Sequence, residues 1–264
     1  MSSAYTTIAT ELRDPHVLVL YLDRPERANA MNTTMGLELR AFFQELYVDP
    51  GELRAIIVTG RGDKAFCAGG DLKDRDGMTD GQWQHQHAIF EQMVRALREC
   101  PVPVLCAVNG AAYGGGCEFA LSCDFIYAAR TARFALTEVT LGIMPGAAGT
   151  INLPHAVGER RAREIIYTGR PFSAVEACDW GLVNKVCEPA DLQDELRATA
   201  VRIAGNAPIA VRQAKKSIAM ATQVDRATAY QFELEAYNRM VPTADRLEGV
   251  RAFNEKRKPR FEGR

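Results

Sequence analysis

Residues 103–124 are the stretch that most constrains how this chain can fold. They read PVLCAVNGAAYGGGCEFALSCD, an apolar and small-residue run that contains three consecutive glycines, Gly114 to Gly116, and one carboxylate, Glu118. Burial penalises the charged form of a carboxylate, so ionised side chains are rarely buried without a partner. Glu118 is therefore expected to be salt-bridged, to face outward at a helix start, or to take part in chemistry.

Composition indicates an ordinary globular protein. The 264 residues are 47% hydrophobic, enough for a full core, and 32 basic against 33 acidic side chains leave a formal net charge of -1. No nucleic-acid or membrane partner is expected from this balance. The seven cysteines show no CxxC spacing and mostly occupy apolar runs, and the N-terminus lacks the basic and apolar segments of a signal peptide. The expected location is cytoplasmic.

Strands that alternate with helices predict an α/β fold. Residues 6–10 and 17–22 read as a hairpin, and apolar strands are expected near 54–59, 104–108 and 125–129. Helices are expected from Asn32 and over 83–98, whereas the polar stretch 73–81 is predicted to be a mobile loop. From Asp191 onward the pattern is almost all helical, over 192–204, 209–221, 225–240 and 244–254. This change predicts a subdomain boundary near residue 200.

Two glycine loops occur where a strand is expected to give way to a helix. One is Ala68-Gly69-Gly70-Asp71, and the other is Gly114-Gly115-Gly116. Helix N-termini present unpaired N–H groups, and glycine allows a ligand to approach the backbone closely. Two such helix starts can converge on one carbonyl oxygen as an oxyanion hole. Tight turns or close helix packing explain either loop taken alone, and no nucleotide-binding glycine spacing is present.

A second acid, Glu138, follows Glu118 after the apolar stretch 134–136. Two carboxylates beside an oxyanion hole suit proton transfer next to a carbonyl group. Taken separately, Glu118 is more simply a first-turn acid that complements a helix dipole, and Glu138 a surface acid. Spacing in the sequence does not decide between these interpretations.

Other chemistry has weaker support. His85 and His87 have one metal-ligand spacing, but no cluster of Cys, Asp or Glu completes a site, so no metal is expected. A serine hydrolase lacks its G-x-S-x-G motif, and no Cys/His pair indicates thiol chemistry. The basic run 256–258 is expected to be a solvated end, or else to meet a ligand phosphate.

Taken together, the motifs resemble the enoyl-CoA hydratase/isomerase (crotonase) superfamily over nearly the whole chain. The matching stretches are Asn29-Ala-Met-Asn32, Ala65-Phe-Cys-Ala-Gly-Gly-Asp-Leu72, Ala107-Val-Asn-Gly110 with Gly114-Gly-Gly-Cys-Glu118, Leu141-Gly-Ile-Met-Pro-Gly146, Thr168-Gly-Arg170, Gly181-Leu-Val-Asn184, and Glu248-Gly249 with Glu255-Lys-Arg-Lys258. The resemblance implies an α/β spiral of β-β-α turns over residues 1–200, which holds the acyl-CoA site. It also implies an all-helical oligomerisation region over residues 201–264, with a tail that contacts CoA, in a homotrimer or homohexamer.

The resemblance to the hydratase branch, in which both glutamates are present, implies syn addition of water across a trans-2-enoyl-CoA. In that mechanism Glu118 activates the water, Glu138 protonates the α-carbon, and the N–H groups of Gly70 and Gly115 stabilise the enolate. This is carbon–oxygen lyase chemistry of fatty acid metabolism, and it needs no cofactor because coenzyme A is part of the substrate. The residues that map to the CoA site are Ala68, Asp71, Leu72, Lys73, Phe253 and Lys256.

Departures from the family pattern concern the substrate. Leu136-Thr137-Glu138 lacks the proline that many short-chain hydratases carry before the second glutamate, and residues 148–153 read AGTINL where those enzymes have GGTQRL. The acyl pocket is therefore expected to differ, and Leu136 resembles the methylglutaconyl-type hydratases. A Δ3,Δ2-enoyl-CoA isomerase that uses chiefly Glu138 is one alternative. A catalytically idle scaffold that binds RNA or a protein is another, and the balanced charge argues against its RNA-binding form.

Overall fold

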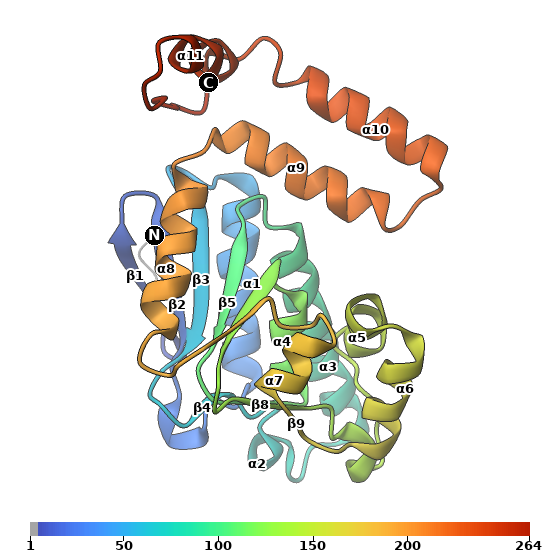
Figure 1. Ribbon diagram of the computed structural model, residues 1–264. Helices are drawn as coiled ribbons and strands as arrows, with labels where there is room; N and C mark the ends of the chain where they lie inside the picture. Colours follow the sequence, from blue (N-terminus) through green and yellow to red (C-terminus); the bar gives the residue numbers. More distant parts are fainter. Residues whose placement is uncertain (1–4) are drawn as a thin grey trace.

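The computed structural model describes residues 5–264, so the first four residues of the segment considered for a signal peptide lie outside the described residues. Between residues 55 and 168 the chain winds through three turns, each with a strand in a larger sheet, a strand in a smaller sheet and then one or two α-helices (Figure 1). The predicted α/β class is confirmed.

Two sheets form the body of the described chain. The larger contains, in spatial order, β1 (Ile8–Asp14), β2 (Val17–Leu22), β3 (Ala55–Gly60), β5 (Val104–Val108), β7 (Phe125–Ala129) and β10 (Lys185–Cys187). The smaller contains β4 (Ala65–Cys67), β6 (Ala111–Tyr113), β8 (Arg133–Ala135) and β9 (Phe172–Ser173). Only the β1–β2 and β8–β9 pairs are antiparallel among these strands. β3 and β5 are buried along their whole length, as expected of central parallel strands that read as continuous apolar runs.

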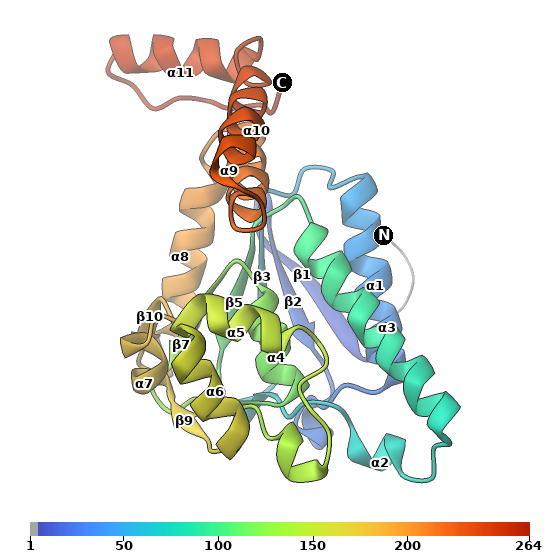
Figure 2. The same ribbon diagram turned by 90° about the vertical axis from the view of Figure 1, so that its right-hand side faces the viewer.

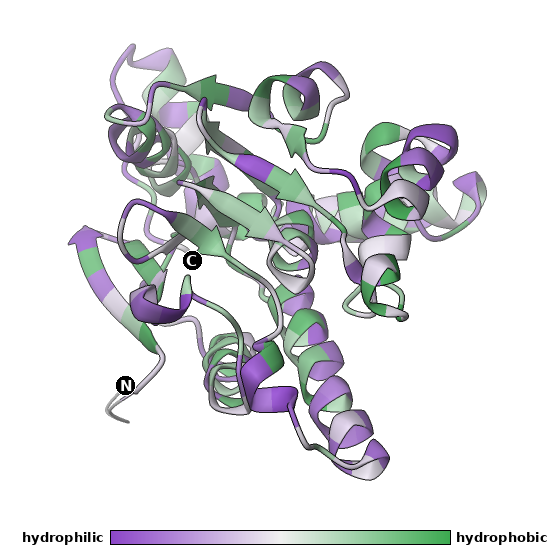
Figure 3. Cartoon of the chain, turned by 90° about the horizontal axis from the view of Figure 1, so that it is seen from below, coloured by the Kyte–Doolittle hydropathy of each residue, from purple (hydrophilic) through white to green (hydrophobic). Residues whose placement is uncertain are grey.

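Helices cover both faces of the larger sheet. The helices of the described residues are α1 (Thr33–Val48), α2 (Leu72–Arg75), α3 (Asp80–Glu99), α4 (Gly115–Ser122), α5 (Gly149–Val157), α6 (Glu159–Thr168), α7 (Ala174–Asp179), α8 (Leu192–Ala204), α9 (Pro208–Ala221), α10 (Arg226–Asn238) and α11 (Ala244–Asn254). Helices α1 and α3 pack together on one side, and α8 packs on the other (Figure 2). Figure 3 shows mostly green strands, and helices that carry both apolar and polar residues. No helix of residues 5–264 combines the length and hydropathy that a membrane crossing requires.

The local capping signals explain where several helices begin. The Asn32 side chain accepts a hydrogen bond from the N–H of Met35, which confirms the predicted start of α1. The prediction of a loop over 73–81 is wrong at both of its ends. Asp71 caps the short helix α2, and a capping box of Thr79 and Gln82 starts α3 at Asp80. The starts of α2 and α3 were missed because the residues there are mostly polar and show no apolar period.

Helix α4 lies directly against strand β4. A Cβ atom added to Gly116 would lie 2.2 Å from the carbonyl oxygen of Cys67 and 2.7 Å from the Cys67 Cβ. Only glycine permits this approach, since the Cys67 carbonyl belongs to the backbone and cannot rotate away. The close packing fixes the N-terminus of α4 beside the loop that follows β4.

We expect Gly116→Ala to destabilise the protein although alanine favours helices. The intrinsic helix preference alone would stabilise by about 1 kcal/mol, whereas overpacking against Cys67 costs about 1–3 kcal/mol. Gly81→Ala in α3 is the matched control, because a Cβ there meets no atom within 4 Å. Urea unfolding should show a loss of stability for Gly116→Ala and none for Gly81→Ala. Equal stability of the two variants would contradict the packing argument.

Candidate active site

The two glycine loops meet at the N-terminus of α4. A Cβ atom on Gly69 would lie 3.2 Å from the backbone nitrogen of Gly115, and a Cβ on Gly115 would lie 3.7 Å from the nitrogen of Gly70. Among residues 5–264, neither the Gly70 N–H nor the Gly115 N–H donates a hydrogen bond to a protein acceptor. Two neighbouring amide donors are therefore available to a ligand oxygen.

Backbone hydrogen bonds hold both loops in place. The N–H of Met31 donates to the Gly69 carbonyl at 2.8 Å, and the N–H of Asp71 donates to the Met31 carbonyl at 2.9 Å. On the other side, the N–H of Gly114 donates to the Ala135 carbonyl at 2.9 Å. The two free amides thus belong to segments with fixed positions.

Glu118 lies in α4 and is buried, with 3% of its surface exposed. The N–H groups of Ala147 and Gly149 both donate to its Oε1 atom at 2.8 Å. Burial raises the pKa of Glu118, and these two amide hydrogen bonds partly oppose the rise. No salt bridge reaches it among the described residues, and it does not face solvent. Two of the three explanations offered by the sequence are therefore excluded, and the carboxylate is instead satisfied by backbone amides.

Glu138 begins the 3-10 helix η2 (Glu138–Leu141) and is 8% exposed. Neither of its carboxylate oxygens has a hydrogen-bond partner within residues 5–264. Burial first, and then the nearby charge of Glu118, raise its pKa to about 7. A Cβ on Gly114 would lie 3.2 Å from Glu138 Oε1, which places this carboxyl group at the start of α4. Its interpretation as a surface acid is wrong.

The arrangement combines two kinds of chemical group at one helix start. The amides of Gly70 and Gly115 can stabilise negative charge on an oxygen, because their donors are already in position. Glu138, with a pKa raised to about 7, can gain or lose a proton near neutral pH, and burial raises the pKa of the neighbouring Glu118 as well. Unpartnered buried oxygens such as those of Glu138 are rare in proteins and are expected at functional sites.

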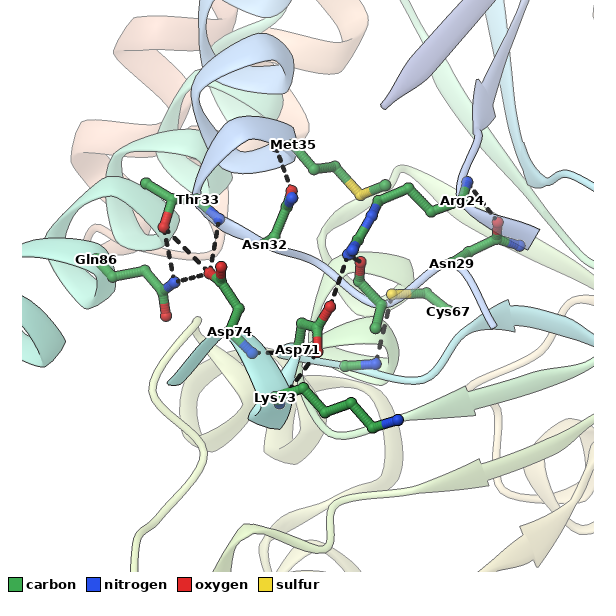
Figure 4. Close-up of polar contacts among 12 residues, drawn as sticks. Arg24, Asn29, Asn32, Thr33, Met35, Cys67, Asp71, Lys73, Asp74 and Gln86 are labelled. Atoms are coloured by element: carbon green, nitrogen blue, oxygen red, sulfur yellow. Dashed lines mark hydrogen bonds and ion pairs between the residues drawn. The ribbon is translucent and has the colours of Figure 1, made fainter. Parts of the chain in front are cut away.

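The residues expected at the CoA site differ in their surroundings. Asp71 caps α2 and accepts a hydrogen bond from Arg24 Nη1 at 3.0 Å (Figure 4), so its carboxylate already has protein partners. Ala68, Leu72 and Lys73 are exposed around the same loop. All four residues lie within three positions of Gly70 along the chain.

Phe253 and Lys256 lie elsewhere in the chain. Phe253 is 84% exposed on α11, and Lys256 follows that helix. Figures 1 and 2 place α11 at the end of the molecule opposite to α2. The structure of one chain does not bring these two residues to the glycine loops.

Sequence reasoning missed the loop that holds Glu118. Its amide donors belong to Ala147 and Gly149, where α5 begins with a glycine after a left-handed Ala148. The available signal was a third glycine at a helix start, beside the turn-rich segment that precedes it. His87 Nε2 lies 3.0 Å from the Gly146 carbonyl oxygen in this loop. No group of three or more His, Cys, Asp or Glu side chains in the described residues forms a metal site.

Comparison with known proteins decides the family. The family model described as enoyl-CoA hydratase/isomerase matches residues 13–264. The chain belongs to this family. It is 38% identical to crotonyl-CoA hydratase of Syntrophomonas wolfei, with 98% of each chain covered. It is 39% identical to short-chain-enoyl-CoA hydratase of Clostridium acetobutylicum, over 93% of this chain and 94% of the other.

Solved structures confirm the expected fold of this hydratase/isomerase family member. The crystal structure of enoyl-CoA hydratase from Bacillus anthracis superimposes with a TM-score of 0.96 at 43% identity. The match covers 98% of this chain and 100% of that chain. The crotonase-like architecture predicted from the motifs is therefore correct.

The burial of Glu138 predicts a pH dependence of stability. Its pKa is about 7 in the folded protein against an ordinary value of 4.5, so between these pH values the folded state keeps a proton that the unfolded state has lost. Stability therefore falls as pH rises through this window. We expect Glu138→Gln to reduce this fall by up to roughly 2 kcal/mol between pH 5 and pH 8.

Urea unfolding at the two pH values measures this effect. Glu45→Gln is the matched control, because Glu45 is exposed on α1 and its carboxylate has no partner among the described residues. A Glu138→Gln variant whose stability changes with pH as much as that of the wild-type protein would contradict the assignment.

Proposed function

We propose that the protein is an enoyl-CoA hydratase that adds water across a trans-2-enoyl-CoA to give a 3-hydroxyacyl-CoA. The observation that supports this most strongly is the unequal environment of two buried carboxylates beside two free amides. Glu118 accepts two backbone hydrogen bonds, whereas both oxygens of Glu138 lack a partner within residues 5–264. Hydration needs one group that activates water and one that delivers a proton to carbon.

The thioester oxygen is proposed to accept hydrogen bonds from Gly70 and Gly115. Attack at C3 moves the electron pair of the C2–C3 double bond toward the thioester carbonyl, so negative charge develops on that oxygen. Donors that are already fixed by backbone contacts stabilise this charge without rearranging. A charged enolate oxygen gains more from these bonds than the neutral carbonyl of the substrate does.

The two glutamates then divide the proton transfers. Glu118, oriented by the amides of Ala147 and Gly149, takes a proton from the water whose oxygen bonds to C3. Glu138, with a pKa of about 7, retains its proton in a large fraction of molecules at neutral pH and gives it to C2. A proton passes from Glu118 back to Glu138 after product release, which restores the starting state.

Coenzyme A is part of the substrate in this proposal, and no other cofactor is required. Ala68, Asp71, Leu72 and Lys73 would contact CoA beside the Gly70 loop. Phe253 and Lys256 are too far along the molecule to do so within one chain, so they would reach CoA on a neighbouring copy (Figure 1). Large apolar side chains are exposed on the terminal helices, among them Ile218, Leu234 and Val250.

We propose accordingly that residues 201–264 form the oligomerisation region, and residues 1–200 the spiral core, of a homotrimer or homohexamer. A cytoplasmic role in fatty acid metabolism fits this activity.

Two related activities have specific support. A Δ3,Δ2-enoyl-CoA isomerase needs one carboxyl group that moves a proton between C2 and C4, and the unpartnered Glu138 suits that task. Buried Leu136 has an apolar side chain that offers no hydrogen bond, as in the methylglutaconyl-type hydratases that it resembles. Deuterium uptake from D2O without a hydrated product would favour the isomerase.

We expect Glu118→Gln and Glu138→Gln each to lower kcat by about 10²-fold or more, the usual scale of general acid–base catalysis. Turnover is followed at the absorbance of the conjugated thioester, across enoyl-CoAs of varied length and branching. Glu45→Gln should retain full activity, and circular dichroism should show that all three variants are folded. Full activity of both site variants on the best substrate would overturn the hydratase proposal.

A further inference from the structure

Arg75 is a half-buried arginine whose position the proposed hydration leaves unexplained. It ends α2, and its Nε donates to Gln86 Oε1 at 2.7 Å. Gln86 is only 2% exposed, and its Nε2 donates to Thr33 Oγ1 at 2.8 Å and to Asp74 Oδ2 at 2.9 Å (Figure 4). This buried amide therefore fixes the direction of the guanidinium group.

Aromatic rings hold the guanidinium on another side. Its Cζ atom lies 4.4 Å from the ring centroid of Trp83 and 5.6 Å from that of Phe90. No carboxylate forms a salt bridge with Arg75 among residues 5–264, and its two terminal nitrogens donate no hydrogen bond there. Arginine is favoured in buried ion pairs, and its two terminal nitrogens frequently bind one carboxylate or phosphate together.

The unpaired nitrogens lie beside the proposed oxyanion hole. A Cβ atom on Gly70 would lie 3.3 Å from Arg75 Cζ, 3.4 Å from Nη1 and 3.5 Å from Nη2. Gly70 is also the residue whose N–H is proposed to hold the thioester oxygen. The charged group thus lies within the reach of a short acyl chain whose carbonyl is bound at Gly70.

We propose that Arg75 binds a carboxylate at the far end of the acyl group, so that the preferred substrates are short 2-enoyl-CoAs with an anionic terminus. This inference rests on the acyl-CoA site proposed above. Both terminal nitrogens lack a protein acceptor within residues 5–264, so both are available for two parallel N–H···O bonds to one carboxylate.

An anionic acyl group can bind beside the two glutamates only if a nearby cation compensates its charge. Glu118 and Glu138 are both buried near the reacting carbons, and an added carboxylate would be repelled by any negative charge on them. Arg75 supplies a compensating positive charge that remains protonated at all relevant pH values. An apolar acyl chain would instead leave this guanidinium unpaired and partly desolvated.

A phosphate of CoA is the main competing anion. It is present in every acyl-CoA, so loss of an arginine that binds it would weaken all substrates equally. A purely structural role of Arg75 in holding α2 would have the same result. A carboxylate at the acyl terminus predicts a selective effect, which a matched pair of substrates can measure.

The test compares glutaconyl-CoA with trans-2-pentenoyl-CoA, two five-carbon 2-enoyl-CoAs that end in a carboxylate and in a methyl group. We expect the wild-type protein to prefer glutaconyl-CoA in kcat/KM. Arg75→Leu should lower this preference by roughly 10²-fold, because a charged hydrogen-bonded pair is lost. Arg75→Lys should retain part of the preference, since it keeps the charge but not the two-nitrogen geometry.

Arg98→Leu is the matched control, because Arg98 is exposed on α3 and its removal changes the net charge by the same amount. It should leave the preference unchanged. Equal losses on both substrates for Arg75→Leu, or an unchanged ratio, would overturn the inference.

Binding of the saturated analogues glutaryl-CoA and pentanoyl-CoA, measured by calorimetry, separates this inference from the proposed reaction. A preference for glutaryl-CoA that Arg75→Leu abolishes, in a protein that hydrates neither enoyl-CoA, would support acyl recognition and reject the hydratase. The absence of any such binding preference in the wild-type protein would reject the role of Arg75, even where hydration is observed.

Discussion

The close backbone contact between α4 and β4 determines how the rest of the site is built. Gly116 lies against the carbonyl of Cys67 with no room for a side chain, and Gly69 approaches the start of the same helix. This contact places the positive end of α4 beside a second backbone segment rather than in solvent. The free amides of Gly70 and Gly115 become neighbours because the two segments are packed this tightly.

The same packing removes two carboxylates from water but leaves them in different environments. Glu118 receives the amides of Ala147 and Gly149, which oppose the rise of its pKa, whereas Glu138 receives none from residues 5–264. Desolvation therefore acts on Glu138 with little opposition, and the charge of Glu118 adds to it. Glu118 and Glu138 therefore differ in how readily they bind a proton, and only their surroundings cause this difference.

Motif and periodicity predicted the α/β fold and singled out the two glycine loops and both glutamates as candidates, whereas only the resemblance to the family predicted that they act together. The Asn32 side chain caps α1 as predicted, and the apolar runs near 54–59 and 104–108 form the buried central strands β3 and β5. The contacts of Glu118 with Ala147 and Gly149 were missed, since every residue type carries a backbone amide and only the glycine at the start of α5 marked this loop. Arg75 was overlooked for a similar reason, because its surroundings come from α3 and from a stretch expected to be a loop.

Helix α2 connects the chemistry to the proposed recognition of the acyl group. Asp71 caps it and binds Arg24, so its first turn is fixed to the body of the protein immediately after Gly70. Arg75 ends the same four-residue helix, and Gln86 fixes its side chain. The distance between the oxyanion amide and the guanidinium is therefore set by one short rigid element. An acyl chain that is bound at both ends must match that distance, so α2 would select chain length and terminal charge together.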